Sequence, residues 1–270
     1  MDWKVGGVKY RVEEQGSGPP LLLLHGFTGG AVNWEPFVPA WSLRFRVIRV
    51  DLIGHGETDS PGDPARYSME SVVADLVGIL DSLGVKKTDL LGYSMGGRLA
   101  LSLATTHPER VQRLMLESSS PGLKTREERE ERIRRDEALA DRIETDGIRA
   151  FVDAWEQIPL FASQRFLPEE VRRKLREQRL ANHPRGLANS LRGMGTGAQP
   201  SWWASLDRLT LPVLLIKGEW DAKFCRIAEE MKDKLADARM ETVKGAGHAV
   251  HVEQPRRFER IVLDFLTSKI

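Results

Sequence analysis

Ser94 stands at the centre of Gly92-Tyr93-Ser94-Met95-Gly96, which fits the pattern G-x-S-x-G. The pattern follows a short apolar run typical of a strand and precedes a helical pattern, the context in which such a serine acts as a nucleophile or base. Its glycines suit a sharp strand-to-helix turn, because the strained serine leaves no room for side chains on either flank. The motif therefore favours a reactive serine over an ordinary glycine-rich turn.

An acid and an imidazole follow the serine in the order that a Ser-Asp-His triad on this kind of sheet requires. Asp221 comes just beyond one strand-like run, and His248 just beyond the next. Since the carboxyl ends of parallel strands meet at one edge of a sheet, we expect Ser94, Asp221 and His248 to meet there. The alternatives are a helix N-cap for Asp221 and an ordinary loop position for His248, with Glu219 and His251 as the reserve acid and base.

Two backbone N–H groups are candidates for an oxyanion site. Phe27 follows the apolar run "LLLLHG", and Met95 follows the serine directly. In sites of this type a pair of N–H groups binds the oxygen on which negative charge develops. We therefore expect Phe27 and Met95 to supply the pair, and His25 and His55, in neighbouring loops, to have structural roles.

Arg98 lies four residues after Ser94, in the first turn of the expected helix. A cation in this position opposes the helix dipole, which favours anions at the N-terminal end. Something should offset that penalty. The candidates are a nearby acidic side chain and a substrate carboxylate held by a bidentate contact.

The rest of the chain predicts an α/β fold, with a mostly parallel central sheet flanked by helices, because short apolar runs alternate with longer amphipathic ones. Ser68 is the expected N-cap of a helix over 69–83, and Gly84 its stop. The expected strands are an edge strand in "KVGGVKYRVEE" and strands in "PLLLLHG", "FRVIRV", 88–91, 111–117, "LPVLLIKG" and "ARMETVKG". The other expected helices cover 95–106, 224–234 and 256–268.

Residues 121–203 are different in kind, since they are highly charged, helical in period and without a convincing strand. The sequence therefore predicts a core domain, 1–120 and 204–270, with a helical lid inserted at 121–203. Open α/β sheets bind ligands beyond the carboxyl ends of their strands. We expect the lid to cover that edge of the sheet.

The first lid helix begins with Thr125 and Glu128 at capping-box spacing. Acid–arginine pairs four residues apart should form weak surface ion pairs there; they are Glu128–Arg132, Glu130–Arg134 and Glu131–Arg135. At about 100° per residue, Arg129 and Arg132 fall within or beside the apolar stripe of this helix. Arg132 therefore either faces the covered site or stays in solvent.

Composition excludes several classes of partner. The 270 residues carry a formal net charge of +1, without the basic excess that nucleic-acid binding requires. The single cysteine, Cys225, rules out an internal disulfide and fits a reducing cytoplasm. Neither a signal peptide nor an apolar run of membrane-helix length is recognised. We expect a cytoplasmic protein, monomeric or weakly self-associating, that acts on a small molecule and binds no nucleic acid or membrane.

These residues resemble the α/β-hydrolase superfamily over nearly the whole chain. More narrowly, the sequence is similar to the 2-succinyl-6-hydroxy-2,4-cyclohexadiene-1-carboxylate synthases, a family of menaquinone-pathway enzymes. The narrower likeness is carried by "GYSMGGRLAL", "PGLKTREER", "WEQIPLFASQ", "ANSLRGMGTGAQPSWW" and "DAKFCRIAEEM". The phrases from the insertion are the most specific, because hydrolase insertions otherwise vary widely.

The resemblance implies a lyase that removes pyruvate from an enolpyruvyl-bearing cyclohexene, with no metal or organic cofactor. It implies that Ser94 is the base, activated by His248 and Asp221, and that Phe27 and Met95 stabilise an enolate-like oxygen. The substrate-binding positions that it implies are Tyr93, Arg98, Arg132, Trp155 and Arg179. Such a substrate has three carboxylates and would need several fixed cations.

Two other functions stay open. A serine esterase or C–C bond hydrolase would use the same triad, and would turn over activated esters such as p-nitrophenyl acetate without needing Arg98. A catalytically silent binding module would keep the pocket and lose the chemistry, although the joint presence of Ser94, Asp221 and His248 speaks against it. Trp155 has an equally good interpretation as core packing beneath the lid.

Overall fold

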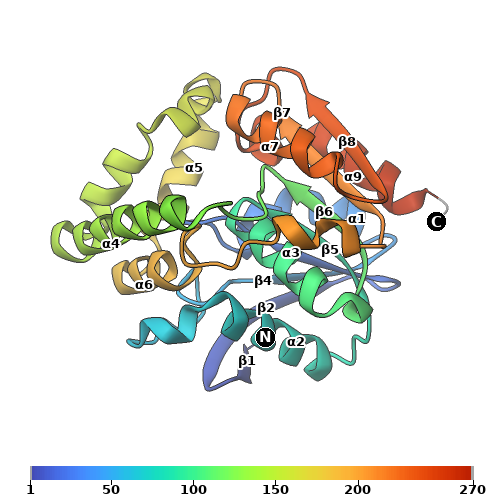
Figure 1. Cartoon of the computed structure of the whole chain (residues 1–270), viewed down its shortest axis with the longest axis horizontal. Helices are drawn as coiled ribbons and strands as arrows, with labels where there is room; N and C mark the ends of the chain where they lie inside the picture. The colour runs from blue at the N-terminus through green and yellow to red at the C-terminus, as the bar shows by residue number, and fades with distance from the viewer. Residues whose placement is uncertain (1, 269–270) are drawn as a thin grey trace.

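The computed structural model describes residues 2–268, which fold around an eight-stranded sheet with helices on both faces (Figure 1). The strand order is β1-β2-β4-β3-β5-β6-β7-β8, and every pairing from β4 to β8 is parallel. The strands are β1 (Asp2–Val5), β2 (Val8–Gln15), β3 (Pro20–Leu24), β4 (Arg46–Val50), β5 (Thr88–Tyr93), β6 (Val111–Glu117), β7 (Val213–Gly218) and β8 (Ala238–Val243). The expected α/β architecture is confirmed.

The helices alternate with the strands, as the periodicity predicted. They are α1 (Val38–Trp41), α2 (Met69–Ser82), α3 (Met95–Thr106), α4 (Arg126–Trp155), α5 (Glu169–Leu180), α6 (Pro184–Met194), α7 (Ala222–Lys232), α8 (Val250–Glu253) and α9 (Pro255–Thr267). The predicted cap of α2 is present, because the Ser68 hydroxyl accepts a hydrogen bond from the Ser71 N–H. Among these helices none combines the length and apolar character needed to cross a membrane.

The leucine run of β3 shows how the two faces of the sheet are buried. Leu22 and Leu24 belong to the core cluster that includes residues of α2, α3 and α7. Leu21 and Leu23 point the other way, into the cluster that includes residues of α1 and α9. Because side chains alternate along a strand, a continuous apolar run is what a strand covered on both faces requires.

The order of β4, β3 and β5 creates the crevice in which the site lies. After β3 the chain passes to β4 on one side of it and then returns to β5 on the other side. Loops that leave neighbouring strands in opposite directions open a gap at their carboxyl ends. The β3 and β5 loops, which contain Phe27 and Ser94, flank this switch point.

The structure differs from the sequence-based expectation at two places, the N-terminal strand and the segment after His248. The N-terminal stretch expected as one edge strand is the antiparallel hairpin β1–β2, which turns at Gly6 and Gly7. The short helix α8 just after His248 had no expected counterpart. Its four residues are too few to show a helical period.

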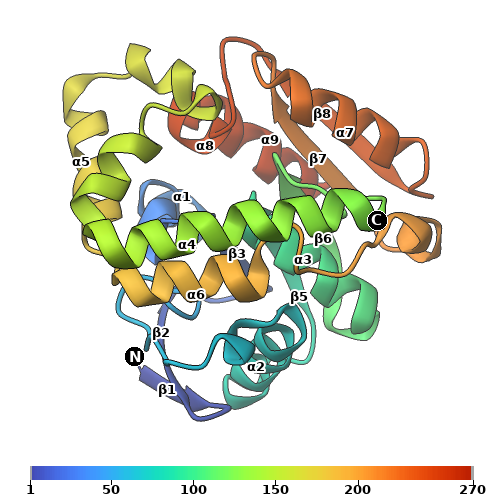
Figure 2. The same ribbon diagram turned by 60° about the vertical axis from the view of Figure 1, so that its left-hand side comes forward.

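Residues 121–203 contain α4, α5 and α6 together with a 3₁₀ segment (Pro159–Phe166), and no strand. Figures 1 and 2 show these helices grouped beside the sheet, with α4 and α6 running side by side. The capping box at the start of α4 is present, since Thr125 and Glu128 each accept a backbone hydrogen bond from the other. Helical geometry breaks at Gly147, whose φ of 82° suits a residue without a side chain.

The expected surface pairs of α4 are only partly correct. Arg135 does pair with Glu131. Glu128 does not pair with Arg132, because its carboxylate accepts from the Lys124 and Thr125 N–H groups at the helix start. Glu130 pairs instead with Arg126, Arg134 with Glu131, and Arg132 with Asp136.

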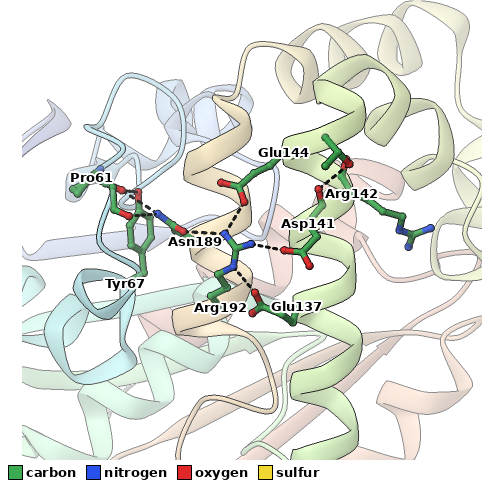
Figure 3. Close-up of polar contacts among 10 residues, drawn as sticks. Pro61, Tyr67, Glu137, Asp141, Arg142, Glu144, Asn189 and Arg192 are labelled. Atoms are coloured by element: carbon green, nitrogen blue, oxygen red, sulfur yellow. Dashed lines mark hydrogen bonds and ion pairs between the residues drawn. The ribbon is translucent and has the colours of Figure 1, made fainter.

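Arg192 of α6 joins three carboxylates of α4. Figure 3 shows its guanidinium between Glu137, Asp141 and Glu144, at 2.9, 2.7 and 2.8 Å. Its neighbour Asn189 donates to the Pro61 carbonyl at 3.1 Å, which ties the same helix to the core. One arginine therefore holds together α4 and α6, while Asn189 attaches α6 to the loop that follows β4.

Two buried histidines hold together the loops that follow β3 and β4. The Leu52 N–H donates to His25 Nε2 at 2.9 Å, so His25 Nδ1 is protonated and donates to the Gly26 carbonyl. His55 Nδ1 lies 3.1 Å from the Ile53 carbonyl. Burial lowers the pKa of His25 to about 4 and, with help from His25, that of His55 to about 3. Both are neutral structural residues, as expected.

We predict that Arg192→Met weakens the packing of α4 against α6. Loss of the guanidinium leaves three like-charged carboxylates on one face of α4, at a cost of about 1–2 kcal/mol because the acids are largely solvated. Limited proteolysis should cut residues 121–203 faster, and urea unfolding should shift to lower concentration. Arg142→Met is the matched control, because Arg142 is exposed on the same helix and extends away from the cluster (Figure 3). Equal behaviour of the two variants would refute this account.

We also predict acid lability from His25 and His55. Their folded pKa values lie below the usual 6.5, so below pH 6.5 the unfolded chain takes up protons that the folded chain does not. The contribution of these two histidines to the free energy of unfolding is therefore fully present above pH 6.5. It falls as the pH drops towards 4, by up to about 1.4 kcal/mol per pH unit for each histidine. His55→Asn keeps a donor near Ile53 and cannot titrate. Urea unfolding across this range should show a shallower slope, whereas exposed His183→Asn should leave the slope unchanged.

Candidate active site

Ser94 lies on the sharp turn between β5 and α3, with φ of 49° and ψ of −107°. The turn brings Gly96 so close to β3 that a side chain there would collide with the carbonyl oxygens of Leu24 and His25. The Ser94 N–H donates to the Glu117 carbonyl at 2.8 Å, which fixes the turn against the end of β6. The backbone strain of Ser94 is thus held by the strands on both sides.

The predicted triad residues are in contact. Ser94 Oγ lies 3.0 Å from His248 Nε2, and His248 Nδ1 lies 2.6 Å from Asp221 Oδ2. His248 and Asp221 are buried. The other carboxylate oxygen of Asp221 accepts the Phe224 N–H at 3.2 Å and caps α7. The sequence had offered helix cap and triad acid as alternatives, and Asp221 has the contacts of both.

The reserve candidates are engaged elsewhere. Glu219 accepts the Gly245 N–H at 3.0 Å. His251 forms a buried pair with Glu117 at 2.9 Å, and its ring lies 4.6 Å from that of Tyr93. Within residues 2–268 neither forms a hydrogen bond with Ser94, so His248 is the imidazole that can take a proton from the serine.

A cavity of about 200 Å³ opens above Ser94. Its walls are of two kinds. One part is apolar and aromatic, and the other contains three cationic side chains. The apolar part includes Phe27, Leu139, Trp155, Leu160, Phe161 and Leu191, and the cationic part includes Arg98, Arg132 and Lys223. Such a cavity fits a small molecule with an apolar ring and anionic substituents.

Phe27 and Met95 both line this cavity beside Ser94. Met95 is the first residue of α3, where backbone N–H groups have no partner within the helix. Within residues 2–268, no hydrogen-bond acceptor occupies the backbone N–H of Phe27. Neither N–H group has an acceptor among the described residues, and their role in an oxyanion site stays a prediction.

Arg98 is held in the cavity wall by neutral acceptors. It donates to the Met194 carbonyl at 2.7 Å and to the side-chain oxygen of Gln199. No carboxylate within residues 2–268 lies within ion-pair distance of it. Burial, followed by the positive charge of Arg132, lowers the pKa of Arg98 to about 9. The structure thus disfavours the nearby acid that the sequence offered as one possible partner.

Arg132 faces the cavity, and its Nε donates to Asp136 at 2.8 Å. Asp136 is buried, and its second oxygen has no hydrogen-bond partner among the described residues. Burial raises the pKa of Asp136, although Arg132 lowers it in part. Of the two orientations that the sequence left open for Arg132, the structure has the inward one, and its terminal N–H groups have no hydrogen-bond partner within residues 2–268.

Lys223 is the cavity residue that the sequence reasoning missed. It follows the triad acid by two residues, in the first turn of α7. The signal that singled out Arg98, a cation at the start of a helix, applies to Lys223 equally. It passed unnoticed because the sequence placed the start of this helix at residue 224, which left Lys223 in the preceding loop.

Tyr93 and Trp155 both line the cavity. Trp155 also packs edge-on against Phe27, with ring centroids 5.4 Å apart, and against Phe161 at 5.7 Å. Its indole N–H is buried without a partner in the described part of the chain. Packing and cavity lining, the two interpretations left open for Trp155, are therefore compatible.

Arg179 is not brought to this cavity. It is buried, pairs with Glu156 at 3.1 Å and donates to Gln164 at 2.9 Å. Its guanidinium lies 5.1 Å from the centroid of the Phe161 ring and borders a separate cavity of about 40 Å³. A substrate-binding role for Arg179 stays a prediction without support from this arrangement.

Across residues 2–268, no group of three or more His, Cys, Asp or Glu side chains is placed to hold a metal ion. The chemistry that the described residues offer is general acid–base or nucleophilic catalysis by the triad, next to N–H donors and fixed cations.

Comparison with known proteins agrees with this geometry. A family profile described as the alpha/beta hydrolase fold matches residues 19–255. A Bacillus subtilis (strain 168) protein, named provisionally as a 2-succinyl-6-hydroxy-2,4-cyclohexadiene-1-carboxylate synthase, is 53% identical over 264 residues, covering 97% of this chain and 96% of the relative. A synthase of the same name from Pectobacterium atrosepticum is 31% identical over 255 residues, covering 93% and 95%.

Solved structures give the same grouping and also show how widely the fold is used. MenH from S. aureus superposes with a TM-score of 0.91 at 36% identity, covering 95% of this chain and 97% of that one. An enol-lactonase from Burkholderia xenovorans LB400 superposes with a TM-score of 0.87 at 25% identity, covering 99% and 100%. By the profile match and by the identity and coverage of these relatives, the chain belongs to the alpha/beta hydrolase fold family and, within it, to the 2-succinyl-6-hydroxy-2,4-cyclohexadiene-1-carboxylate synthases.

Proposed function

We propose that this protein is a carbon–oxygen lyase of menaquinone biosynthesis. It eliminates pyruvate from 2-succinyl-5-enolpyruvyl-6-hydroxy-3-cyclohexene-1-carboxylate and releases 2-succinyl-6-hydroxy-2,4-cyclohexadiene-1-carboxylate. The observation that carries the proposal is Arg98, a cation that forms no ion pair within residues 2–268, one helical turn after the triad serine. The names of the relatives that cover nearly the whole chain point to the same reaction.

The chemistry of the substrate explains why a triad suits an elimination. The ring carbon that carries the succinyl group has a proton next to a ketone. Removing it places negative charge on the ketone oxygen, and the electrons then form the 2,4-diene as the bond from C5 to the enolpyruvyl oxygen breaks. The departing group takes up a proton and becomes pyruvate. No water is consumed, so the step needs a base, an oxyanion site and a fixed substrate.

Each part of this reaction has a candidate residue in the cavity. Ser94 acts as the base through His248, which Asp221 orients and keeps in the correct tautomer. The Phe27 and Met95 N–H groups stabilise the developing oxyanion. The aromatic wall that includes Tyr93 and Trp155 packs against the ring, while Arg98 and Arg132 bind carboxylates.

Residues 121–203 serve in this proposal as the lid over the substrate. They supply Arg132, Leu139 and Trp155 to the cavity wall, as well as the Met194 carbonyl that holds Arg98. A cover of this kind limits the access of water and strengthens the electrostatic contacts beneath it. The remaining chain, 1–120 and 204–270, supplies the triad.

The rival function is hydrolysis. The enol-lactonase neighbour shares the fold, and a triad with an oxyanion site would serve ester cleavage as well. The two functions differ in what Arg98 does. An esterase of neutral esters does not need the cation, whereas a lyase acting on a tricarboxylate does.

The decisive experiment incubates the purified protein with the enolpyruvyl substrate prepared in situ. We expect pyruvate release far above the spontaneous rate, and p-nitrophenyl acetate turnover close to background. Ser94→Ala should lower the lyase rate by about 10³-fold or more, since base and nucleophile roles are removed together. Pyruvate release at the spontaneous rate, with brisk ester cleavage, would establish the hydrolase instead.

Arg98→Met should lower kcat/KM for pyruvate release about 10- to 100-fold, the range expected when a charge-assisted contact of about 1.5–3 kcal/mol is lost. Ester turnover should hardly change. Arg126→Met, at an exposed position of α4, is the matched control. Melting temperatures must accompany the kinetics, because Arg98 also holds Met194 and Gln199. A kcat/KM that matches the control in a folded variant would contradict the assigned role.

The proposal includes a small-molecule partner and a cytoplasmic location. The single cysteine, Cys225, is a free thiol, as a reducing compartment allows. A monomeric or weakly self-associating state stays a prediction that sedimentation velocity would test.

A further inference from the structure

We propose that Lys223 is a specificity-determining residue of this site, the third cation that binds a carboxylate of the substrate. The inference deepens the proposed function. It assigns to Lys223 the place that the family likeness implied for Arg179. The juxtaposition that carries it is the sharing of one cavity by Arg98, Arg132 and Lys223 beside Ser94.

Lys223 is placed at the cavity by the triad itself. Asp221 caps α7, so the residue two positions later lies in the first turn of that helix, next to the serine and imidazole. Phe224 and Ile227 of the same helix also line the cavity, and the Phe224 ring lies 4.7 Å from the His248 ring. The first turns of α7 therefore form one wall of the site.

The ammonium group of Lys223 has no acceptor. In residues 2–268 it makes no hydrogen bond and no ion pair, and it lies 5.5 Å from the centroid of the Phe224 ring. Other lysines of the chain behave differently. Lys217 and Lys124, for example, both pair with glutamates of α7.

The surroundings of Lys223 are unfavourable for an empty site. Burial lowers the pKa of Lys223, and the charges of Arg132 and Arg98 lower it further, while Asp221 raises it. Arg132 similarly lowers the pKa of Arg98. Three cations thus share one cavity, and the carboxylates that offset their charge, Asp136 and Asp221, already contact Arg132 and His248. A bound anion relieves the repulsion among these cations.

The charges of the proposed substrate match this arrangement. The ring, the succinyl chain and the enolpyruvyl group carry one carboxylate each, and the cavity offers Arg98, Arg132 and Lys223. Arg179 is a poorer third partner, because Glu156 already neutralises it and Phe161 lies between it and the cavity. Solvent reaches Lys223, so its contact should resemble a rim charge and contribute less than a buried pair.

The test compares Lys223→Met and Lys223→Arg in the pyruvate-release assay, with Lys232→Met on the same helix as the matched control. For Lys223→Met we expect KM to rise about 5- to 10-fold with kcat within twofold, and for Lys223→Arg a KM near that of the unaltered protein. Raising the salt concentration should increase KM more for the unaltered protein than for Lys223→Met, because the lost contact is screened by salt. The melting temperature of Lys223→Met should be unchanged or higher, since a repelled charge is removed.

A second measurement separates this inference from the proposed reaction. Calorimetric titration with propane-1,2,3-tricarboxylate, an unreactive trianion, should show weaker binding to Lys223→Met than to Lys232→Met. That difference would support the anion site even if no pyruvate were released, an outcome that would overturn the proposed reaction alone. An active protein whose KM and trianion affinity are unaffected by Lys223→Met would overturn the inference alone. A rise in KM for Arg179→Met but not for Lys223→Met, with the melting temperature of Arg179→Met unchanged, would also overturn it.

Discussion

Electrostatic repulsion inside a partly enclosed cavity is the constraint on which the site depends. Arg98 and Arg132 are held close together, and each lowers the protonation tendency of a neighbouring cation. A protein tolerates such an arrangement only if the rest of the fold fixes it. Here the Met194 carbonyl and the Gln199 side chain, both neutral, hold Arg98. Asp136 is the carboxylate that holds Arg132. The net positive charge is therefore left for a ligand to neutralise.

The backbone that positions these cations is equally constrained. Ser94 can adopt its unusual conformation because Gly96 lets α3 approach the end of β3, and because β6 accepts the serine N–H. The same turn sets the direction of α3, and hence the place of Arg98 one turn later. The reactive hydroxyl and the first cation thus have a common geometric origin. Moving one would move the other.

Much of this arrangement could be predicted from the sequence, because it follows from local rules. Strand ends converge at one edge of a parallel sheet, so Asp221 and His248 could be placed near Ser94 from their order alone. The start of α4 could be predicted from Thr125 and Glu128, because their spacing is the one that a capping box requires. The helical period placed Arg132 at the edge of the apolar stripe and left open whether it faces inward.

The contacts that could not be predicted are those for which several partners compete. These partners are other charged side chains, some of them distant in the sequence, and backbone N–H groups. Arg179 had the type and approximate location of a substrate ligand, but Glu156, 23 residues earlier, neutralises it. Glu128 was expected to pair with Arg132, yet the helix start takes its carboxylate first. Lys223 was overlooked because the start expected for α7, at residue 224, left it in the preceding loop. Each outcome needed the tertiary arrangement.

The two oxygens of Asp221 have a mechanical consequence. One lies 2.6 Å from Nδ1 of the His248 imidazole, and the other accepts the Phe224 N–H and caps α7, the helix that brings Lys223 to the cavity wall. A displacement of α7 would therefore shift the carboxyl group that contacts the imidazole. The cationic wall and the triad are in this way mechanically coupled through one side chain.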